Sequence, residues 1–264
     1  MSAPAEATRV KVCGLTLTDD VEAAVAAGAW AVGFILTRSP RQVTPAAAAV
    51  LVRAAADATA RRGAHSPAPA DAAALSGGDR READGTTTDE VLTVAVFTTE
   101  SAAEIAETAR VAGVSAVQLS GGVDGPGCAA VRAAMRAAGC RPAALIAAPD
   151  CAGSDTADYV LLDSRYVAAD ADGDGDGGDV DGQTVYGGTG RPLDWDQLEL
   201  PLDRRVVLAG GITPASAPVA IRRLRPYAID VSSGIETSPG VKDHEMLAAL
   251  FDAVAAENQT REPE

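Results

Sequence analysis

Short runs of apolar, mostly β-branched residues alternate with alanine-rich segments along this 264-residue chain, and this alternation constrains its fold more than any other feature. Eight runs are predicted as strands: Arg9–Cys13, Trp30–Leu36, Leu92–Phe97, Ala116–Leu119, Ala143–Ala147, Tyr159–Asp163, Arg205–Ala209 and Ala228–Ser232. Most are apolar at nearly every position, which is typical of parallel strands covered on both faces. Eight strands alternating with helices predict an α/β fold, a closed (β/α)8 TIM barrel, formed as one domain over residues 9–256.

The segments between these runs carry helix signals. Thr18 is expected to cap the first helix, and Gly28 to end it in a left-handed turn. Pro45 is expected to open the second helix, with Val50 and Leu51 on its buried side. An open, doubly wound sheet is the alternative fold. No GxGxxG motif follows the first strand and no P-loop occurs in the chain, so the barrel is favoured.

Two segments fall outside the alternating pattern and are predicted as polar loop insertions, which we expect to be disordered. Residues 58–89 contain almost no large apolar side chain, and residues 168–183 hold six aspartates and no basic residue. The aspartate spacing in the second segment partly imitates a calcium-binding loop. A solvated acidic loop is favoured there, and a specific cation site is the alternative.

The charge of the chain excludes one class of partner. It has 37 Asp and Glu against 22 Lys and Arg, a net charge of -15, and its only lysines are Lys11 and Lys242. Binding to a nucleic-acid backbone needs a basic face, so nucleic acid is not expected as a partner. Acidity with so little lysine resembles proteins of salt-adapted cytoplasm, and a halophilic protein is predicted.

Other features bear on where the protein works. Four scattered cysteines give neither a disulfide framework nor a CxxC metal site, so reduced thiols and no metal are expected. No apolar run is long enough to span a bilayer, and no signal-peptide pattern begins the chain. A cytoplasmic protein with no membrane partner is predicted. Its oligomeric state, monomer or homodimer, is not readable from the sequence.

The ends of the predicted strands carry the candidate chemistry, because barrel enzymes place their working residues there. Cys13 ends the first strand and Asp163 ends the sixth, which suggests a thiolate base and a carboxylic acid at one mouth. Inert packing of the cysteine and helix capping by the aspartate are the alternatives. Arg41, after the second strand, is a candidate for binding an anion.

The turns after the last two strands indicate phosphate binding. Gly211 follows the seventh strand, and Ser232, Ser233 and Gly234 follow the eighth, just after Asp230. Glycine and serine there let backbone N–H groups converge on an anion. The residues alone therefore suggest a phosphorylated small molecule as the ligand.

Taken together, the motifs resemble the phosphoribosylanthranilate isomerase family. The matching stretches are VKVCGLT (10–16), AVGFILTRSPRQV (31–43), VAVFTT (94–99), VQLSGG (117–122), LLDS (161–164), GGTGRPLDW (187–195), VVLAGGITP (206–214) and DVSSGIETSPGVKD (230–243). They occur in the family's order and extend from about residue 9 to the last helix. The resemblance implies a cofactor-free (β/α)8 enzyme of tryptophan biosynthesis. Such an enzyme converts N-(5-phosphoribosyl)anthranilate to the 1-deoxyribulose phosphate by an Amadori rearrangement.

The resemblance also implies roles for individual residues. Asp163 matches the general acid that opens the ribose ring, and Cys13 the general base that removes the C2 proton. Arg41 matches the arginine that pairs with the anthranilate carboxylate, and Asp230 lies beside the substrate. The phosphate cradle is matched by Gly211, Ser232, Ser233 and Gly234.

One departure from the family pattern is the serine at position 120, where the family usually has histidine after the fourth strand. Two other functions remain as alternatives. The histidine-pathway isomerase runs the same chemistry, but would want a carboxylate where this chain has Cys13. The second alternative is a barrel that binds a phosphoribosyl compound without catalysis, or one that acts on a different phosphoribosyl substrate.

The net charge leads to a prediction about salt. Carboxylate repulsion is unscreened at low ionic strength, so the thermal unfolding midpoint should rise from dilute buffer to molar KCl. A thermal melt series in KCl tests this. A midpoint that stays flat across the series would contradict the prediction.

Overall fold

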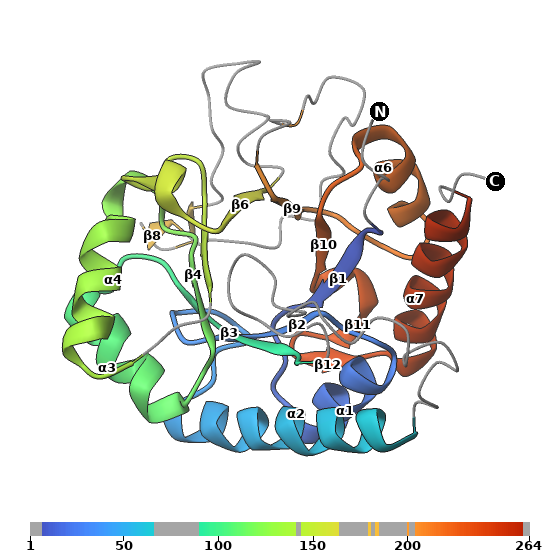
Figure 1. Ribbon diagram of the computed structural model, residues 1–264, viewed down its shortest axis with the longest axis horizontal. Coiled ribbons are helices and arrows are strands. Elements are labelled where there is room, and N and C mark those ends of the chain that lie inside the picture. The colour runs from blue at the N-terminus through green and yellow to red at the C-terminus, as the bar shows by residue number, and fades with distance from the viewer. Residues whose placement is uncertain are drawn as a thin grey trace, which may run out of the picture.

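The structure is a computed structural model that describes residues 7–65, 90–140, 144–163, 179–180, 183–184, 200 and 204–260. Eight parallel strands close into a barrel in the order β1-β10-β9-β6-β5-β4-β3-β2, surrounded by helices (Figure 1). The barrel strands are β1 (Arg9–Val12), β2 (Ala31–Ile35), β3 (Leu92–Phe97), β4 (Ala116–Leu119), β5 (Ala144–Ala147), β6 (Tyr159–Leu162), β9 (Val206–Leu208) and β10 (Ala228–Val231). The predicted (β/α)8 barrel is confirmed, and the open doubly wound sheet is wrong.

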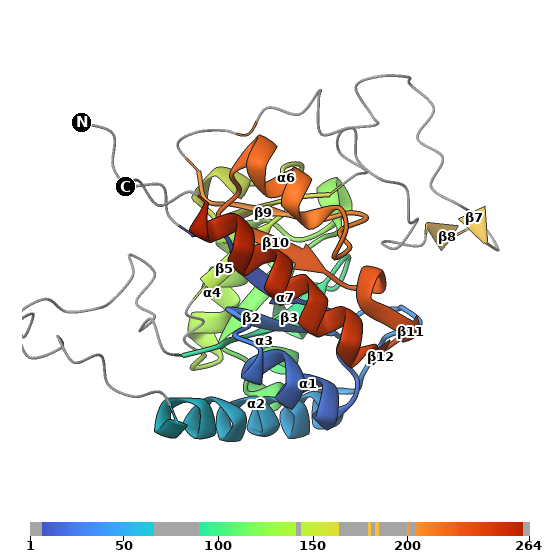
Figure 2. The same ribbon diagram turned by 90° about the vertical axis from the view of Figure 1, so that its right-hand side faces the viewer.

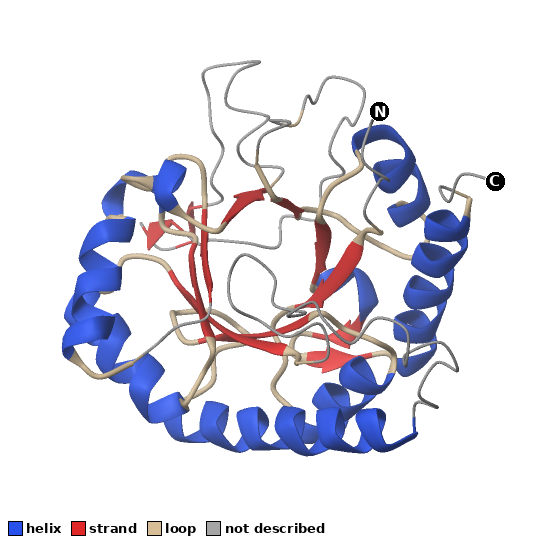
Figure 3. Ribbon diagram, in the orientation of Figure 1, coloured by secondary structure: helices blue, strands red, loops and turns tan. Residues whose placement is uncertain are grey.

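Helices follow most of the barrel strands and form the outer ring (Figure 3). The α-helices of the described residues are α1 (Thr18–Ala26), α2 (Pro45–His65), α3 (Ala102–Ala112), α4 (Cys128–Ala137), α6 (Ala217–Leu224) and α7 (His244–Gln259). The short 3-10 helices are η2 (Gly122–Asp124), η3 (Ser154–Thr156) and η4 (Ser233–Ile235). Between β5 and β6 the connection contains only η3. None of the described helices is long and apolar enough to cross a membrane.

Two small antiparallel ribbons lie outside the barrel sheet. The first pairs β11 (Glu236–Ser238) with β12 (Val241–Lys242), directly before α7 (Figure 2). The second pairs β7 (Asp179–Val180) with β8 (Gln183–Thr184), partly within the predicted acidic insertion. The other residues of that insertion lie outside the described part of the chain.

The first two helices differ in detail from their prediction. Thr18 is not the cap of α1, because Leu17 occupies the N-cap position and makes no side-chain cap. In α2, which begins at Pro45 as predicted, Leu51 is 3% exposed but Val50 is 45% exposed. The side chain of Val50 therefore lies on the solvent side, because adjacent residues of a helix point about 100° apart.

The predicted start of the first insertion, at residue 58, is also wrong. Helix α2 continues to His65, and Ala58 is buried in the hydrophobic core. A helix rich in alanine needs few large side chains to pack closely, so the scarcity of large apolar residues was a misleading signal. Residues 66–89 of this predicted insertion lie outside the described residues.

The core consists of two apolar clusters separated by the barrel wall. Side chains alternate along each strand, so one set points into the barrel and the other toward the helices. Val94, Ile146 and Val207 belong to the inner cluster, while Val32, Phe97 and Leu208 belong to the outer one, which includes helix residues. The barrel interior is therefore a packed core and not a channel.

Three aromatic rings close the N-terminal end of the barrel. Trp30 stacks edge-on against Tyr159 and Tyr227, with ring centroids 5.0 and 5.5 Å away. The guanidinium of Arg9 lies 4.2 Å from the centre of the Tyr227 ring, and that of Arg205 lies 5.0 Å from it. These three large rings therefore fill this end of the barrel.

The orientation of α2 leads to a prediction with an internal control. Leu51→Ala should lower the free energy of unfolding by about 2–5 kcal/mol, because it removes a buried side chain and leaves a cavity. The neighbouring Val50→Ala should change it by less than about 0.5 kcal/mol, because Val50 is exposed. Urea unfolding of both variants measures the difference. Equal losses would mean that α2 packs through another face.

Candidate active site

The barrel brings the predicted site residues to one end. Parallel strands all finish at the same end of a closed barrel. Cys13 directly follows β1, Asp163 follows β6, Gly211 lies just after β9, and Ser232 follows β10. Residues far apart in the sequence therefore share one rim, as their positions after the strands predicted.

Cys13 lies at the rim above a buried ion pair. Lys11 on β1 and Cys13, which directly follows it, are two residues apart, so both side chains point into the barrel. Lys11 Nζ donates to Asp230 Oδ2 at 2.7 Å, and the two residues are also register partners in β1 and β10. Burial raises the pKa of the Cys13 thiol, while the positive charges of Lys11 and Lys242 act in the opposite direction.

Asp230 connects the two proposed catalytic groups electrostatically. Burial raises the pKa of its carboxyl, the Lys11 ammonium opposes this, and the negative charge of Asp163 adds to the rise. Asp163 is therefore within electrostatic range of Asp230, and Asp230 in turn of Cys13. Asp230 Oδ1 is buried and has no hydrogen-bond partner among the described residues. A buried oxygen without a partner is costly unless a ligand completes it.

Arg41 reaches the same rim but is held by a partner that the sequence did not suggest. Its Nε and Nη2 donate to the carboxylate of Glu236 at 2.7–3.0 Å. The side chain of Arg41 is only 14% exposed, and its Nη1 makes no hydrogen bond to a described residue. One edge of the guanidinium is thus occupied, and its far end remains available for an anion.

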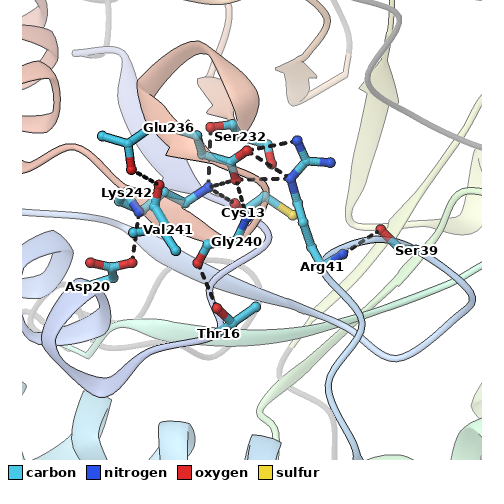
Figure 4. A network of polar contacts seen from close by, with 11 residues as sticks. Cys13, Thr16, Asp20, Ser39, Arg41, Ser232, Glu236, Gly240, Val241 and Lys242 are labelled. Carbon is cyan, nitrogen blue, oxygen red and sulfur yellow. Dashed lines mark hydrogen bonds and ion pairs between the residues drawn. The ribbon is translucent and has the colours of Figure 1, made fainter.

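Lys242, on β12, ties three parts of the rim together (Figure 4). Its ammonium is fully buried and donates to Glu236 Oε1 at 2.7 Å, to the carbonyl of Cys13 at 2.7 Å and to that of Ser232 at 3.2 Å. Burial lowers the pKa of Lys242, and Glu236 opposes this. The lysine links the segments after β1 and β10 to the ribbon β11–β12.

Asp20, on α1, fixes that ribbon from the other side. Its Oδ2 accepts a hydrogen bond from the backbone N–H of Lys242 at 2.9 Å, and its Oδ1 lies 2.8 Å from His244 Nε2. The Asp20 side chain is 4% exposed. It therefore holds the ribbon against α1, in addition to standing in the first turn of that helix.

The predicted phosphate turns lie against each other. An added Cβ at Gly234 would fall 1.8 Å from the carbonyl oxygen of Ile212, so only glycine permits this approach between the turns after β9 and β10. Gly210 and Gly211 both have positive φ, at 91° and 69°. Ser232 Oγ is buried and lacks a partner among the described residues. Such turns can present backbone N–H groups to an anion.

Ser120 stands where the family resemblance led us to expect histidine. It lies just after β4 and is 7% exposed. Its Oγ is 3.0 Å from Gln118 Nε2, whose amide also points into the barrel two residues earlier. Gln118 Oε1 is buried and has no partner within the described part of the chain. It adds a third polar atom without a partner at this end.

Three site residues were not singled out from the sequence as part of the site: Lys11, Glu236 and Lys242. The available signal was the scarcity of lysine. In a chain where arginine supplies almost all the positive charge, the two lysines that remain are both fully buried at the rim. Glu236 and Lys242 also lie in the stretch 230–243, which was matched to the family only as a motif.

The described residues show no metal site. They contain no group of three or more His, Cys, Asp or Glu side chains that could hold a metal ion. The calcium-like aspartate spacing of residues 170–181 falls on residues whose side chains the structure does not describe. That alternative therefore stays a prediction.

Comparison with known proteins assigns the family. The family model for N-(5'phosphoribosyl)anthranilate (PRA) isomerase matches residues 79–253. The chain is 33% identical over 251 residues to the N-(5'-phosphoribosyl)anthranilate isomerase of Dechloromonas aromatica, covering 94% of this chain and 96% of that protein. The chain belongs to the phosphoribosylanthranilate isomerase family.

Further members of this family support the assignment. The isomerase of Chromohalobacter salexigens is 32% identical over 257 residues, covering 97% of this chain and 98% of that protein. The crystal structure of phosphoribosyl anthranilate isomerase from Thermus thermophilus matches with a TM-score of 0.59 and 27% identity, covering 94% of this chain and 99% of that one. The similarity thus extends over nearly the whole chain.

The Glu236 contacts predict how stability depends on pH. Burial raises the pKa of Glu236, but hydrogen bonds from Arg41 and Lys242 outweigh it and hold the pKa below its ordinary value. The resulting stability is present above the unfolded-state pKa of about 4.3 and is lost as pH falls through the lower folded-state value. Glu236→Gln should therefore cost about 3 kcal/mol at neutral pH and less in acid.

The matched control for this variant is Glu107→Gln. Glu107 also pairs with an arginine, Arg110, but both side chains are more than half exposed. This variant should change the free energy of unfolding by less than about 0.5 kcal/mol. Denaturant unfolding at several pH values measures both variants. Equal small losses would show that the Glu236 contacts add no net stability.

Proposed function

We propose that this protein converts N-(5'-phosphoribosyl)anthranilate to 1-(2-carboxyphenylamino)-1-deoxyribulose 5-phosphate, the isomerisation step of tryptophan biosynthesis. The observation that carries the proposal is the convergence of Cys13 and Asp163 on Asp230 at the rim, in a chain of this family. The reaction is an aldose–ketose isomerisation. Its hydrogens move within the substrate and to and from side chains, so the overall conversion is redox-neutral.

Asp163 is the proposed general acid. It donates a proton to the ring oxygen of the ribose as the bond from that oxygen to C1 breaks, and a Schiff base forms between C1 and the anthranilate nitrogen. Asp163 lies at the rim, half-buried, directly after the apolar strand β6. A carboxyl group in such a position reaches the substrate while part of its surroundings excludes water.

Cys13 is the proposed general base. As a thiolate it takes the proton from C2 of the Schiff base, and the electron pair of that C–H bond forms the double bond of an enolamine. The enolamine then loses the proton of its C2 hydroxyl and gains one at C1, giving the ketone. Cys13 is 7% exposed, and Lys11 and Lys242 are the cations beside it.

The two anionic groups of the substrate fit the two remaining parts of the rim. We assign the phosphate to the turns of Gly211, Ser232, Ser233 and Gly234, because they pack together and contain the unpartnered Ser232 Oγ. We assign the anthranilate carboxylate to Arg41, whose Nη1 end is not used by Glu236. Asp230 Oδ1 is assigned a hydroxyl of the sugar, a donor that would satisfy this oxygen.

Loss of anthranilate-type fluorescence tests this function directly. Purified protein in molar KCl, given freshly made phosphoribosylanthranilate, should cause a fast decay. Cys13→Ala and Asp163→Asn should each slow the decay by at least about 100-fold, because each removes one proton transfer. Cys140→Ala is the matched control, because Cys140 lies at the end of α4 and contacts the carbonyl of Ala106 on the outer layer. It should decay like the wild type.

Two outcomes would overturn the proposal. A folded wild-type protein that causes no decay would exclude the isomerase activity and favour the phosphoribosyl-binding alternative. Undiminished turnover by Cys13→Ala would leave the activity in place but exclude the thiolate as its base. Near-ultraviolet circular dichroism of each variant establishes that the fold is intact.

A further inference from the structure

Lysine is nearly absent from this chain, yet one of its two lysines lies inside the barrel. Lys11 has no exposed side-chain surface. The apolar cluster of the barrel interior includes Ala31, its register partner on β2, and Ala228, two residues before its register partner Asp230 on β10. Removing an ammonium from water costs several kcal/mol. Such a group needs a physical reason to be there.

Stability does not supply that reason. Among the described residues, Lys11 donates a hydrogen bond to one oxygen of Asp230, at 2.7 Å. A buried ion pair of this kind generally adds no more stability than two apolar side chains of similar volume would. The second Asp230 oxygen, Oδ1, remains without a partner among the described residues, which makes the pair more costly still.

The geometry places the Lys11 ammonium beside the Cys13 sulfur. An added Cβ at Gly33 of β2 would lie 2.8 Å from Cys13 Sγ and 3.3 Å from Lys11 Nζ. Cys13 Sγ and Lys11 Nζ therefore both lie beside Gly33, and the lack of a side chain at this glycine leaves room for both atoms. Lys11 and Cys13 also influence each other electrostatically, since the ammonium lowers the pKa of the thiol and the thiol raises the pKa of the ammonium.

The other charged groups around Cys13 leave one positive charge in excess. Lys11, Lys242 and Arg41 are the cations of the contacts around Cys13, and Asp230 and Glu236 are their anions. Ionisation of Cys13 would neutralise this cluster. Burial lowers the pKa of Lys11, but Asp230 and Cys13 outweigh it and raise the pKa, so the ammonium keeps its proton.

We propose that Lys11, held in place by Asp230, is the residue that stabilises the thiolate form of Cys13. Lys11 acts through the sulfur and makes no contact of its own with the reacting carbons. Burial raises the pKa of Cys13, and the charge of Lys11 lowers it, so Lys11 reduces the cost of burying a thiolate. For turnover, this inference rests on the proposed role of Cys13 as the base; for the ionisation of the thiol, it stands independently.

Titration of Cys13 tests the proposal without substrate. The ultraviolet absorbance of the thiolate is followed against pH, and the signal of the same protein carrying Cys13→Ser is subtracted to remove the other cysteines and the tyrosines. Lys11→Met should reduce the thiolate fraction at a fixed pH below the midpoint by at least about tenfold. This corresponds to a rise of about one unit in the pKa of Cys13. Asp230→Asn should move the midpoint downward, because it removes a negative charge and leaves the ammonium.

The opposite directions separate an electrostatic role from a structural one. Both variants disturb the same ion pair, so loss of packing alone would move both midpoints the same way or move neither. If Lys11→Met does not fold, the double variant Lys11→Met/Asp230→Asn replaces it, because it removes both charges of the ion pair. The Cys13 titration midpoint of the double variant should lie above that of Asp230→Asn alone. An unchanged midpoint after removal of Lys11, in either background, would overturn the proposal.

The pH profile of kcat/KM separates this inference from the proposed function. Activity that needs the thiolate rises with pH through the Cys13 midpoint, so Lys11→Met should shift that limb to higher pH. A shifted titration together with full activity of Cys13→Ala would uphold the role of Lys11 and exclude the cysteine as base. An unshifted titration together with an inactive Cys13→Ala would exclude the role of Lys11 and uphold the cysteine as the base.

Discussion

The pairing of β1 with β10, where the barrel closes, is the constraint on which the site depends. These first and last strands are in register over four consecutive residues, and Lys11 meets Asp230 across them. Below the pair, Thr8 exchanges two backbone hydrogen bonds with the side chain of Asn258 on α7, which joins the two ends of the chain. Because the closure is exact in register, Cys13 is brought beside groups that lie more than two hundred residues further along the chain.

A second layer of contacts holds the rim from outside the barrel. The ribbon β11–β12 supplies Glu236 and Lys242, which bind Arg41 and the carbonyl of Cys13. Asp20 on α1 fixes the backbone of Lys242. The rim is thus built from buried charges in contact with charges of opposite sign, in a protein with a net charge of -15. Lysine, absent elsewhere in the chain, occurs at the two positions where a compact ammonium is buried.

Much of the architecture could be predicted because it follows from local pattern. All eight strands were located to within one residue at each end, since buried parallel strands are apolar throughout. Pro45 begins α2, and Gly28 has positive φ just after the end of α1, as predicted from backbone geometry that depends on few neighbours. The predictions were wrong where burial depends on how one element packs against another. Val50 and Leu51 are both apolar, and only the position of α2 against α1 and α3 determines which is buried. Residues 58–65 were predicted as the start of an insertion, but they belong to α2, and Ala58 lies in the core.

By itself, the sequence determined the barrel, the rim on which chemistry takes place, and the candidates Cys13, Asp163, Arg41 and the glycine-rich turns, because each follows from strand ends and short motifs. Only the tertiary structure determined which side chains contact these candidates. It placed Glu236 on Arg41, Lys242 on the carbonyl of Cys13 and Lys11 between Asp230 and the thiol. The physical reason is that charge interactions depend on distance in space and on burial, and neither is encoded in the local order of residues.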